Sequence, residues 1–203
     1  SAFLTAPGLA GRVSALLNQL GSQGAPVVEI DRALHGEDLS PAGAFAASLD
    51  SVAMIQYTSG STSRPKGVML THRNLIENAR GMQSHGNFDS DSIGFSWLPP
   101  YHDMGLISGL VLPLCVGYPG ILCASRRFLA RPVSWFESIS QFRATVTGAP
   151  NFAFDYCVDR IHNHELENLN LSSLKAVFNG SEPIRAQTLK RFSERFELIG
   201  LNP

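Results

Sequence analysis

Residues 57–68, YTSGSTSRPKGV, are dense in glycine, serine and threonine and carry one lysine, Lys66. The apolar run at residues 52–55 predicts a buried strand before this segment, and residues 68–70 predict a second strand after it. A loop of this composition between two strands can turn backbone N–H groups and hydroxyls toward an anion, and a lysine adds a mobile positive charge. The segment therefore suggests a phosphate-binding loop.

The same composition has a plainer explanation, because most Gly/Ser/Thr clusters between strands are simple connections. The segment is also not a Walker A motif, since Lys66 is followed by Gly67 rather than by serine or threonine. On composition alone, both explanations stay open.

The whole chain has the character of an ordinary globular protein. It has 203 residues, a formal net charge of −1 and 44% hydrophobic residues. A near-neutral charge leaves no electrostatic footprint for nucleic acid, so we expect no nucleic-acid partner. No apolar run reaches the roughly 20 residues needed to span a bilayer, and the start carries no signal-peptide pattern.

Cysteines and histidines give no sign of a metal site. Cys115, Cys123 and Cys157 stand apart in apolar surroundings, without metal-ligand spacing or the even count of a disulfide framework. We therefore expect buried free thiols and a cytoplasmic protein. His162 and His164 are two residues apart, which predicts different helix faces and argues against a shared metal.

Strands alternate with helical patterns along the chain, as in parallel sheets with helical crossovers. The predicted strands cover residues 2–5, 27–30, 52–55, 68–70, 93–98, 120–124, 144–147 and 174–178. The predicted helices cover residues 9–20, 72–85, 104–116, 132–142, 150–161 and 184–196, and we expect the one at 104–116 to be buried. The fold class is therefore α/β with at least six strands, built as mostly parallel sheets flanked by helices.

A second notable segment, residues 97–105, reads WLPPYHDMG. Its two prolines stiffen a loop beyond the end of a strand, which is where ligands of open α/β sheets bind. His102 is the histidine whose local context suggests a site. Asp103 could instead act as a cap for the helix that begins near Met104.

A third segment, residues 178–183, reads FNGSEP. Asn179-Gly180 predicts a tight turn at the end of a strand, after which Ser181 or Glu182 opens a helix. By itself this is also an ordinary strand–turn–helix junction.

Together, the order and spacing of the three segments resemble those of the adenylate-forming superfamily, which includes CoA ligases, peptide-synthetase adenylation domains and luciferases. The first segment is similar to its phosphate-binding loop, with Ser63 where the usual form has glycine. That departure matters only if the backbone there is left-handed. Residues 98–105 and 178–183 resemble one branch, the fatty acyl-AMP ligases, with Ser181 in place of alanine. The resemblance is most specific from residue 56 to residue 185.

The resemblance implies a set of nucleotide contacts. The ATP phosphates would be held by Thr58, Ser59, Gly60, Ser61, Thr62, Lys66 and Gly67. The adenine and its ribose would pack along Asn179, Gly180, Ser181, Glu182 and Pro183. Lys66 and His102 would be the catalytic residues, with His102 beside the acyl carboxylate and the α-phosphate. Residues 104–112 and 151–154 would line a tunnel for the fatty chain.

The implied reaction is attack of a fatty carboxylate on the α-phosphorus of ATP, which gives acyl-adenylate and pyrophosphate. The acyl group would then pass to an acyl carrier protein, for lipid or polyketide synthesis. Family members place a Mg²⁺ ligand, a ribose-binding aspartate and a small domain with a catalytic lysine beyond the last of these segments. We therefore expect residues 1–203 to be a fragment of the large adenylation domain that folds but does not adenylate alone.

Two alternatives stay open. One is another enzyme of the superfamily, an acyl-CoA ligase or a peptide-synthetase adenylation domain, which residues 99–105 argue against. The other is a non-catalytic module that binds a nucleotide or a partner. The acyl-chain length, the acceptor and the oligomeric state are not encoded in any pattern of this sequence.

Overall fold

The structure is a computed structural model that describes residues 3–5, 8–19, 27–29, 47–58 and 65–202. The chain divides into two compact units, Ser1–Ala47 and Ser48–Pro203. The first unit holds β1 (Phe3–Thr5), α1 (Ala10–Gln19) and β2 (Val27–Glu29). Strands β1 and β2 pair in parallel, so this unit is the predicted strand–helix–strand repeat.

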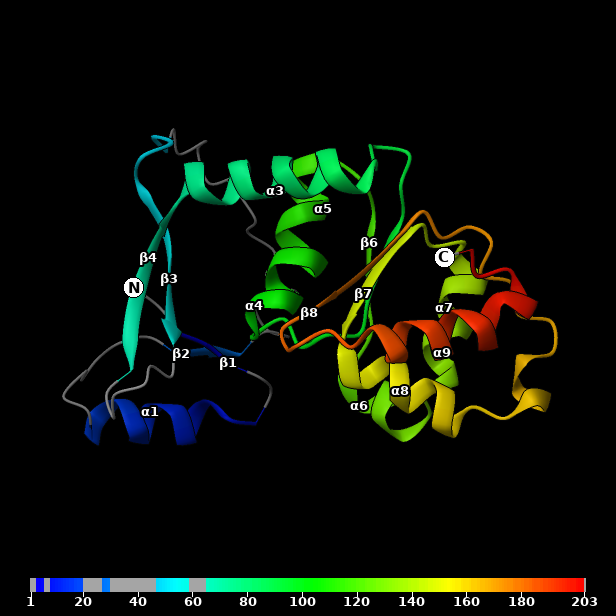
Figure 1. The fold of residues 1–203 in the computed structure, drawn as a ribbon. Helices are drawn as coiled ribbons and strands as arrows, with labels where there is room; N and C mark the ends of the chain where they lie inside the picture. Colours follow the sequence, from blue (N-terminus) through cyan, green and yellow to red (C-terminus); the bar gives the residue numbers. More distant parts are fainter. Residues whose placement is uncertain (1–2, 6–7, 20–26, 30–46, 59–64, 203) are drawn as a thin grey trace. The chain divides into compact units, whose positions relative to one another are not determined.

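The second unit is built around a parallel sheet (Figure 1). Within the described residues, its strand order is β6-β5-β7-β8. The strands are β5 (Gly94–Ser96), β6 (Gly120–Leu122), β7 (Val146–Pro150) and β8 (Ala176–Gly180). Because all four run in the same direction, their carboxyl ends lie at one edge of the sheet. The predicted fold class is confirmed.

Helices cover both faces of this sheet. On one face lies a continuous helical segment made of α4 (Asp103–Leu106), a π-helical turn (Ile107–Val111) and α5 (Leu112–Val116). On the other face lie α6 (Ser125–Ala130), α7 (Val133–Phe142), α8 (Asn151–Arg160) and α9 (Ala186–Phe196) (Figure 1). Short 3₁₀ helices follow α8 and α9, at Asn163–Leu166 and Glu197–Ile199.

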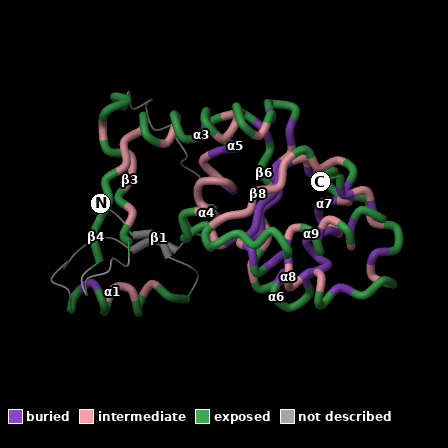
Figure 2. Tube along the Cα trace, viewed as in Figure 1, coloured by how far each residue is buried: buried purple, intermediate pink, exposed green. Residues whose placement is uncertain are grey.

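The core on the α6–α9 side is aromatic. Trp97 and Phe128 stack with ring centroids 3.8 Å apart, and Trp135 meets both rings edge-on. The indole N–H of Trp135 donates to Thr147 Oγ1 at 2.9 Å, so a polar atom in this apolar core is satisfied. Figure 2 shows buried residues along β5 and β7 and on the helices of this side, whereas β8 is of intermediate burial.

An antiparallel hairpin precedes the sheet in the chain. It is formed by β3 (Val52–Thr58) and β4 (Lys66–Thr71), followed by α3 (His72–Gly86). Thr71 and Asn74 form a capping box at the start of α3, and Asn87 ends the helix with a φ of 50°. The predicted helix end at residues 86–87 is confirmed.

The burial predicted for residues 52–55 is wrong. Val52 and Ile55 are 49% and 53% exposed. Among the described residues, β3 pairs only with β4, in a two-stranded sheet. An apolar run shows that a strand tends to be covered, but it does not supply the covering element.

Several predicted elements also differ in detail. The helix at 104–116 contains the π turn, and it is not buried throughout, because Leu114 is 81% exposed and Cys115 is exposed. The last helix begins at Ala186, so neither Ser181 nor Glu182 opens it. Helix α6 was not predicted.

The prediction that His162 and His164 lie on different helix faces is also wrong. The rings of His162 and His164 stack with centroids 5.7 Å apart, because His162 precedes the 3₁₀ helix rather than lying within it. Among the described residues, no group of three His, Cys, Asp or Glu side chains could hold a metal ion. In the same part of the chain, no helix combines the length and apolar character that crossing a bilayer requires.

Candidate active site

The first predicted segment lies at the tip of the hairpin. Thr58 and Lys66 are direct partners in the register of β3 and β4, so the two ends of the loop face each other. Both side chains are exposed. Gly67 follows, and a Cβ there would come within 2.9 Å of Ile55 Cγ2, so the Ile55 side chain would have to shift to admit any other residue. Ser59, Gly60, Ser61, Thr62 and Ser63 lie outside the described residues.

The second segment forms a tight turn beyond the carboxyl end of β5. The backbone N–H of His102 donates to Pro99 O at 3.1 Å. A Cβ on Gly105 would lie 2.1 Å from the same Pro99 oxygen, so only glycine allows α4 to fold back this closely. The turn therefore fixes where His102 stands relative to the sheet.

His102 and Asp103 share the start of α4. His102 occupies the N-cap position, and its Nδ1 lies 2.7 Å from Asp103 Oδ1. Asp103 Oδ1 accepts from Met104 N at 2.6 Å, while His102 Nδ1 is 3.4 Å from the same nitrogen. Asp103 is the first residue of α4, so His102 and not Asp103 is the N-cap. We assign the proton to Nδ1, because the carboxylate contact is the shorter of the two. This leaves Nε2 for a substrate atom.

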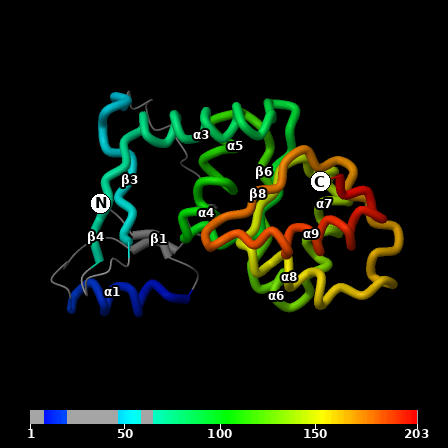
Figure 3. Tube along the Cα trace, viewed as in Figure 1, coloured from blue at the N-terminus to red at the C-terminus, as the bar shows by residue number. Residues whose placement is uncertain are grey.

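The third segment lies at the carboxyl end of β8 and turns at Ser181. Asn179 and Gly180 belong to the strand, and Ser181 has a left-handed backbone with a φ of 67°. Ser181 Oγ donates to Met104 Sδ at 3.2 Å, which joins the second and third segments across 77 residues of sequence. Figure 3 shows β7 and β8 side by side, with the chain turning back after β8 toward α9.

The structure therefore brings two of the three segments together. Among the described residues, no hydrogen bond or ion pair joins Thr58, Lys66 or Gly67 to the other two. Pro183 lies exposed between β8 and α9. Glu182 makes a contact that the sequence did not suggest, because its Oε1 accepts from Phe152 N at 2.6 Å.

The resemblance placed Asn151 only in the wall of an acyl tunnel, and its hydrogen bonds near this site were not anticipated. Asn151 starts α8 directly after β7 and is 4% exposed. Its Oδ1 accepts from Asn179 Nδ2 at 3.3 Å and from Arg185 N at 3.1 Å. The available signal was an asparagine right after a proline at a predicted strand–helix junction, but it gave no indication of which backbone groups the amide would reach.

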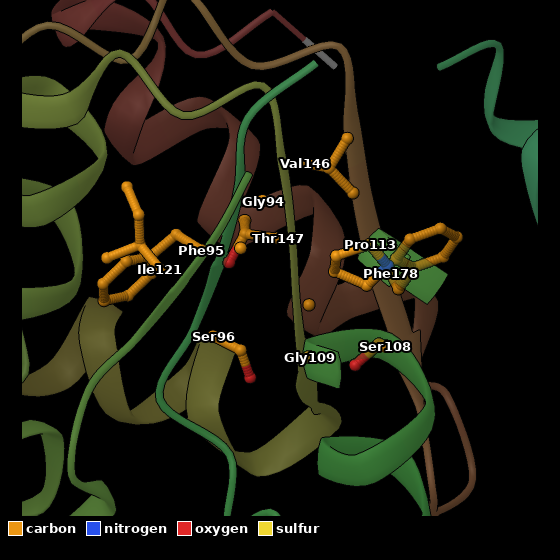
Figure 4. A pocket seen from close by; sticks show the side chains of 12 residues that line it. Gly94, Phe95, Ser96, Ser108, Gly109, Pro113, Ile121, Val146, Thr147 and Phe178 are labelled. Carbon is orange, nitrogen blue, oxygen red and sulfur yellow. The ribbon is translucent and has the colours of Figure 1, made fainter. Parts of the chain in front are cut away.

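A small cavity of about 10 Å³ lies between the π turn and the sheet. Ser108, Gly109 and Pro113 line it from the helical side, with Ser96 and Phe178 among the sheet residues opposite (Figure 4). Of the segments expected to line an acyl tunnel, residues 104–112 reach this cavity and residues 151–154 do not. The cavity has room for one water-sized molecule and is too small for an acyl chain.

Comparison with known proteins identifies the family. Residues 11–201 match the model of the AMP-binding enzyme family, and the chain belongs to this family. It is 44% identical over 151 residues to a medium-chain-fatty-acid–[acyl-carrier-protein] ligase of Moorena producens, covering 74% of this chain and 26% of that protein. It is 36% identical over 208 residues to a putative fatty-acid–CoA ligase of Mycobacterium tuberculosis, covering 98% of this chain and 36% of that protein.

The fold is similar to that of a solved ligase. The crystal structure of a fatty acyl-adenylate ligase from Legionella pneumophila, in complex with acyl adenylate and pyrophosphate, superposes with a TM-score of 0.76 at 38% identity. The match covers 88% of this chain and 31% of that one. The chain thus spans about a quarter to a third of the length of these relatives. The predicted resemblance to the fatty acyl-AMP ligases is confirmed.

Proposed function

We propose that the protein activates a fatty acid with ATP and passes the acyl group to an acyl carrier protein. The observation that carries the proposal is the contact between Ser181 and Met104, 77 residues apart in sequence. It brings the His102 turn and the end of β8 to the same edge of a parallel sheet. This is the edge at which open α/β sheets bind ligands.

In the proposed first step, a carboxylate oxygen attacks the α-phosphorus of ATP. An oxygen–phosphorus bond forms to the acyl group, and the bond to pyrophosphate breaks. Charge builds up on the phosphate oxygens in the transition state, so positively charged and hydrogen-bonding groups at the phosphates supply most of the catalysis. We assign that work to Lys66 and to the surrounding loop residues Thr58, Ser59, Gly60, Ser61, Thr62 and Gly67.

His102 is the second proposed catalytic residue. Its Nδ1 contact with Asp103, at 2.7 Å, fixes the plane of the ring. When protonated, the ring offers its Nε2–H to an oxygen of the acyl carboxylate or the α-phosphate, so it can place the attacking group. The side chain is 56% exposed, and a substrate can therefore reach it.

The adenine and ribose are proposed to lie along residues 179–183, at the carboxyl end of β8. Mg²⁺ is the expected metal, and when bound it would neutralise phosphate charge. The described residues contain no cluster fit to hold it, so we derive no step through the metal. We propose that its ligand lies outside residues 1–203, and that these residues form part of a larger adenylation domain. We also propose a cytoplasmic location, since the three cysteines form no disulfide within the described residues.

Two observations bear on the acceptor. The carrier-protein ligase of Moorena producens favours a carrier protein, whereas the similarity to a putative CoA ligase supports CoA as the second candidate. The test is to incubate the complete gene product with ATP, Mg²⁺ and fatty acids of several lengths, with CoA, with a phosphopantetheine-bearing carrier protein, or with neither. The products are identified by mass.

Acyl-adenylate that persists in the presence of CoA and disappears with the carrier protein is the expected result. Acyl-CoA would make the protein a CoA ligase. If no adenylate forms with any fatty acid, the adenylation proposal is rejected, and a non-catalytic binding module becomes the better explanation.

A further inference from the structure

We propose that Asn151 and Glu182 are positioning residues that clamp the segment 179–185 onto the first turn of α8. The functional consequence rests on the proposed function, because this segment is the proposed wall of the nucleotide site. The geometry of the clamp stands independently of that function. Neither residue needs to touch the nucleotide in order to act.

Asn151 holds both ends of the segment with one atom. Its Oδ1 accepts from Asn179 Nδ2 at 3.3 Å, where β8 ends, and from Arg185 N at 3.1 Å, one residue before α9 begins. A single buried oxygen thus closes the loop between the strand and the helix. Since Asn151 is 4% exposed, water is a poor substitute for these bonds, and their loss leaves polar groups unsatisfied.

Glu182 holds the middle of the segment. Phe152 is the second residue of α8, so its N–H has no partner within that helix. Glu182 Oε1 accepts from this N–H at 2.6 Å. A carboxylate at a helix N-terminus also interacts favourably with the helix dipole, so this bond is stronger than an ordinary one.

A third layer of contacts fixes the orientation of the Asn151 amide. Asn151 Nδ2 donates to Thr188 Oγ1 at 3.4 Å, and Thr188 Oγ1 donates to Asp155 Oδ2 at 2.7 Å. Asp155 is paired in turn with Arg191 at 2.9 Å. The network leaves the Oδ1 atom facing Asn179 and Arg185, and it runs from α8 to α9 without a break.

The clamp explains how Ser181 keeps a left-handed backbone. A non-glycine residue at a φ of 67° is strained, and such strain persists only where the surroundings determine the conformation. Glu182 is the next residue and is anchored to α8, while Ser181 Oγ is held by Met104 Sδ. Release of the segment would therefore disturb both the proposed nucleotide wall and the start of α4, beside His102.

The experiment compares variants of the complete gene product. Asn151→Ala and Glu182→Ala remove the clamp, and Glu182→Gln keeps an oxygen that can accept from Phe152 N. Glu165→Ala is the matched control, because Glu165 Oε2 accepts from the backbone N–H of His162 at 3.0 Å beyond the opposite end of α8. The readouts are the KM for ATP, kcat, the melting temperature, and hydrogen exchange of the peptide that covers residues 179–185.

We expect the two clamp variants to raise the KM for ATP by about tenfold and to speed exchange in residues 179–185. Glu182→Gln should stay within about threefold of the wild type in both readouts, since it retains a neutral hydrogen bond. Glu165→Ala should lower the melting temperature and leave both readouts unchanged. If Glu182→Ala and Glu165→Ala behave alike, the clamp is rejected.

The experiment distinguishes a failure of the proposed function from a failure of the clamp. A wild-type protein that forms no adenylate and binds no ATP rejects the function, and hydrogen exchange then decides the clamp alone. Wild-type exchange in residues 179–185 of both Asn151→Ala and Glu182→Ala would overturn the clamp, whatever the activity of the protein.

Discussion

Ser181 combines a polar contact with a backbone conformation that most side chains avoid. At its φ of 67°, asparagine is tolerated better than other non-glycine residues, and β-branched residues are tolerated least. We expect Ser181→Val to lower the free energy of unfolding by about 1–2 kcal/mol relative to Ser181→Asn, measured by urea denaturation. Both variants lose the hydroxyl that contacts Met104, so their difference isolates the backbone. Equal stabilities would show that the left-handed conformation is not what limits this position.

The burial of Tyr118 leads us to expect that the protein's free energy of unfolding falls at alkaline pH. Burial raises the pKa of Tyr118 to about 12, and its hydroxyl has no hydrogen-bond partner among the described residues. In the unfolded chain the hydroxyl ionises near pH 10. Between about pH 10 and 12 the unfolded state therefore binds fewer protons than the folded state, and stability falls as pH rises.

Tyr118→Phe tests this effect. The variant should unfold at the same or higher denaturant concentration at pH 7, because it removes a buried hydroxyl that lacks a partner. Between pH 10 and 12 it should lose about 1.4 kcal/mol per pH unit less than the wild type. Parallel stability curves for the two proteins over this range would contradict the prediction.

At the scale of elements, strands and long helices were predictable and short or irregular pieces were not. Periodic apolar residues marked α3 and α9, and the capping asparagine at residue 87 marked where α3 ends. Helix α6 was not predicted because it has only six residues and follows Ala124, which offers no side-chain cap. The π turn was not predicted because residues 107–111 contain no proline, and a single glycine such as Gly109 is also tolerated inside an α-helix.

In the candidate site, too, some features could be predicted from the sequence and others could not. The sequence located its segments at strand ends, which is why the positions of His102 and Asn179 could be anticipated. The sequence did not show the hydrogen bonds of Asn151, because a side-chain amide can bond to groups of several nearby segments and the sequence does not say which of them lie close. The turn at Ser181 was also missed, since Asn179 and Gly180 are the usual turn formers and yet continue β8 here.

At Gly148 the strands β7 and β8 approach each other closely. The two strands pair with Gly148 opposite Phe178, and a Cβ on Gly148 would lie 2.9 Å from Phe178 Cβ and 3.2 Å from Phe178 O. Part of the contact is backbone and cannot rotate away. We expect Gly148→Ala to destabilise the protein by about 1–3 kcal/mol, as overpacking does. Chemical denaturation measures the change.

Gly81→Ala is the matched control for Gly148. Gly81 lies inside α3, and a Cβ there would have nothing within 4 Å. Alanine should stabilise this helix by about 0.5–1 kcal/mol, because it has the higher helix propensity. If both substitutions shift stability in the same direction, the close approach at Gly148 is not a constraint on the sheet.

At the scale of the whole molecule, buried residues are distributed unevenly between the two units. Both apolar clusters of the core lie in residues 48–203, and Trp97 and Trp135 belong to the larger one. Among residues 8–19 and 47, for which burial is described in the first unit, Leu17 is the one buried residue. The chain length predicted one domain or a little more, and the family resemblance implied a fragment of one adenylation domain; neither gave a sign of this division.

The division predicts that residues 48–203 fold without residues 1–47. A chain of residues 48–203 retains the parallel sheet, the helices on both its faces and the stacked Trp97–Phe128 pair. It should therefore keep the near-ultraviolet circular dichroism of its buried tryptophans and unfold cooperatively in urea. Trp135→Ala in the same chain should abolish both signals, because removal of a large buried aromatic costs about 3–5 kcal/mol. If the shortened chain lacks tertiary signal while residues 1–203 show it, the first unit contributes essential contacts, and the core is not self-sufficient.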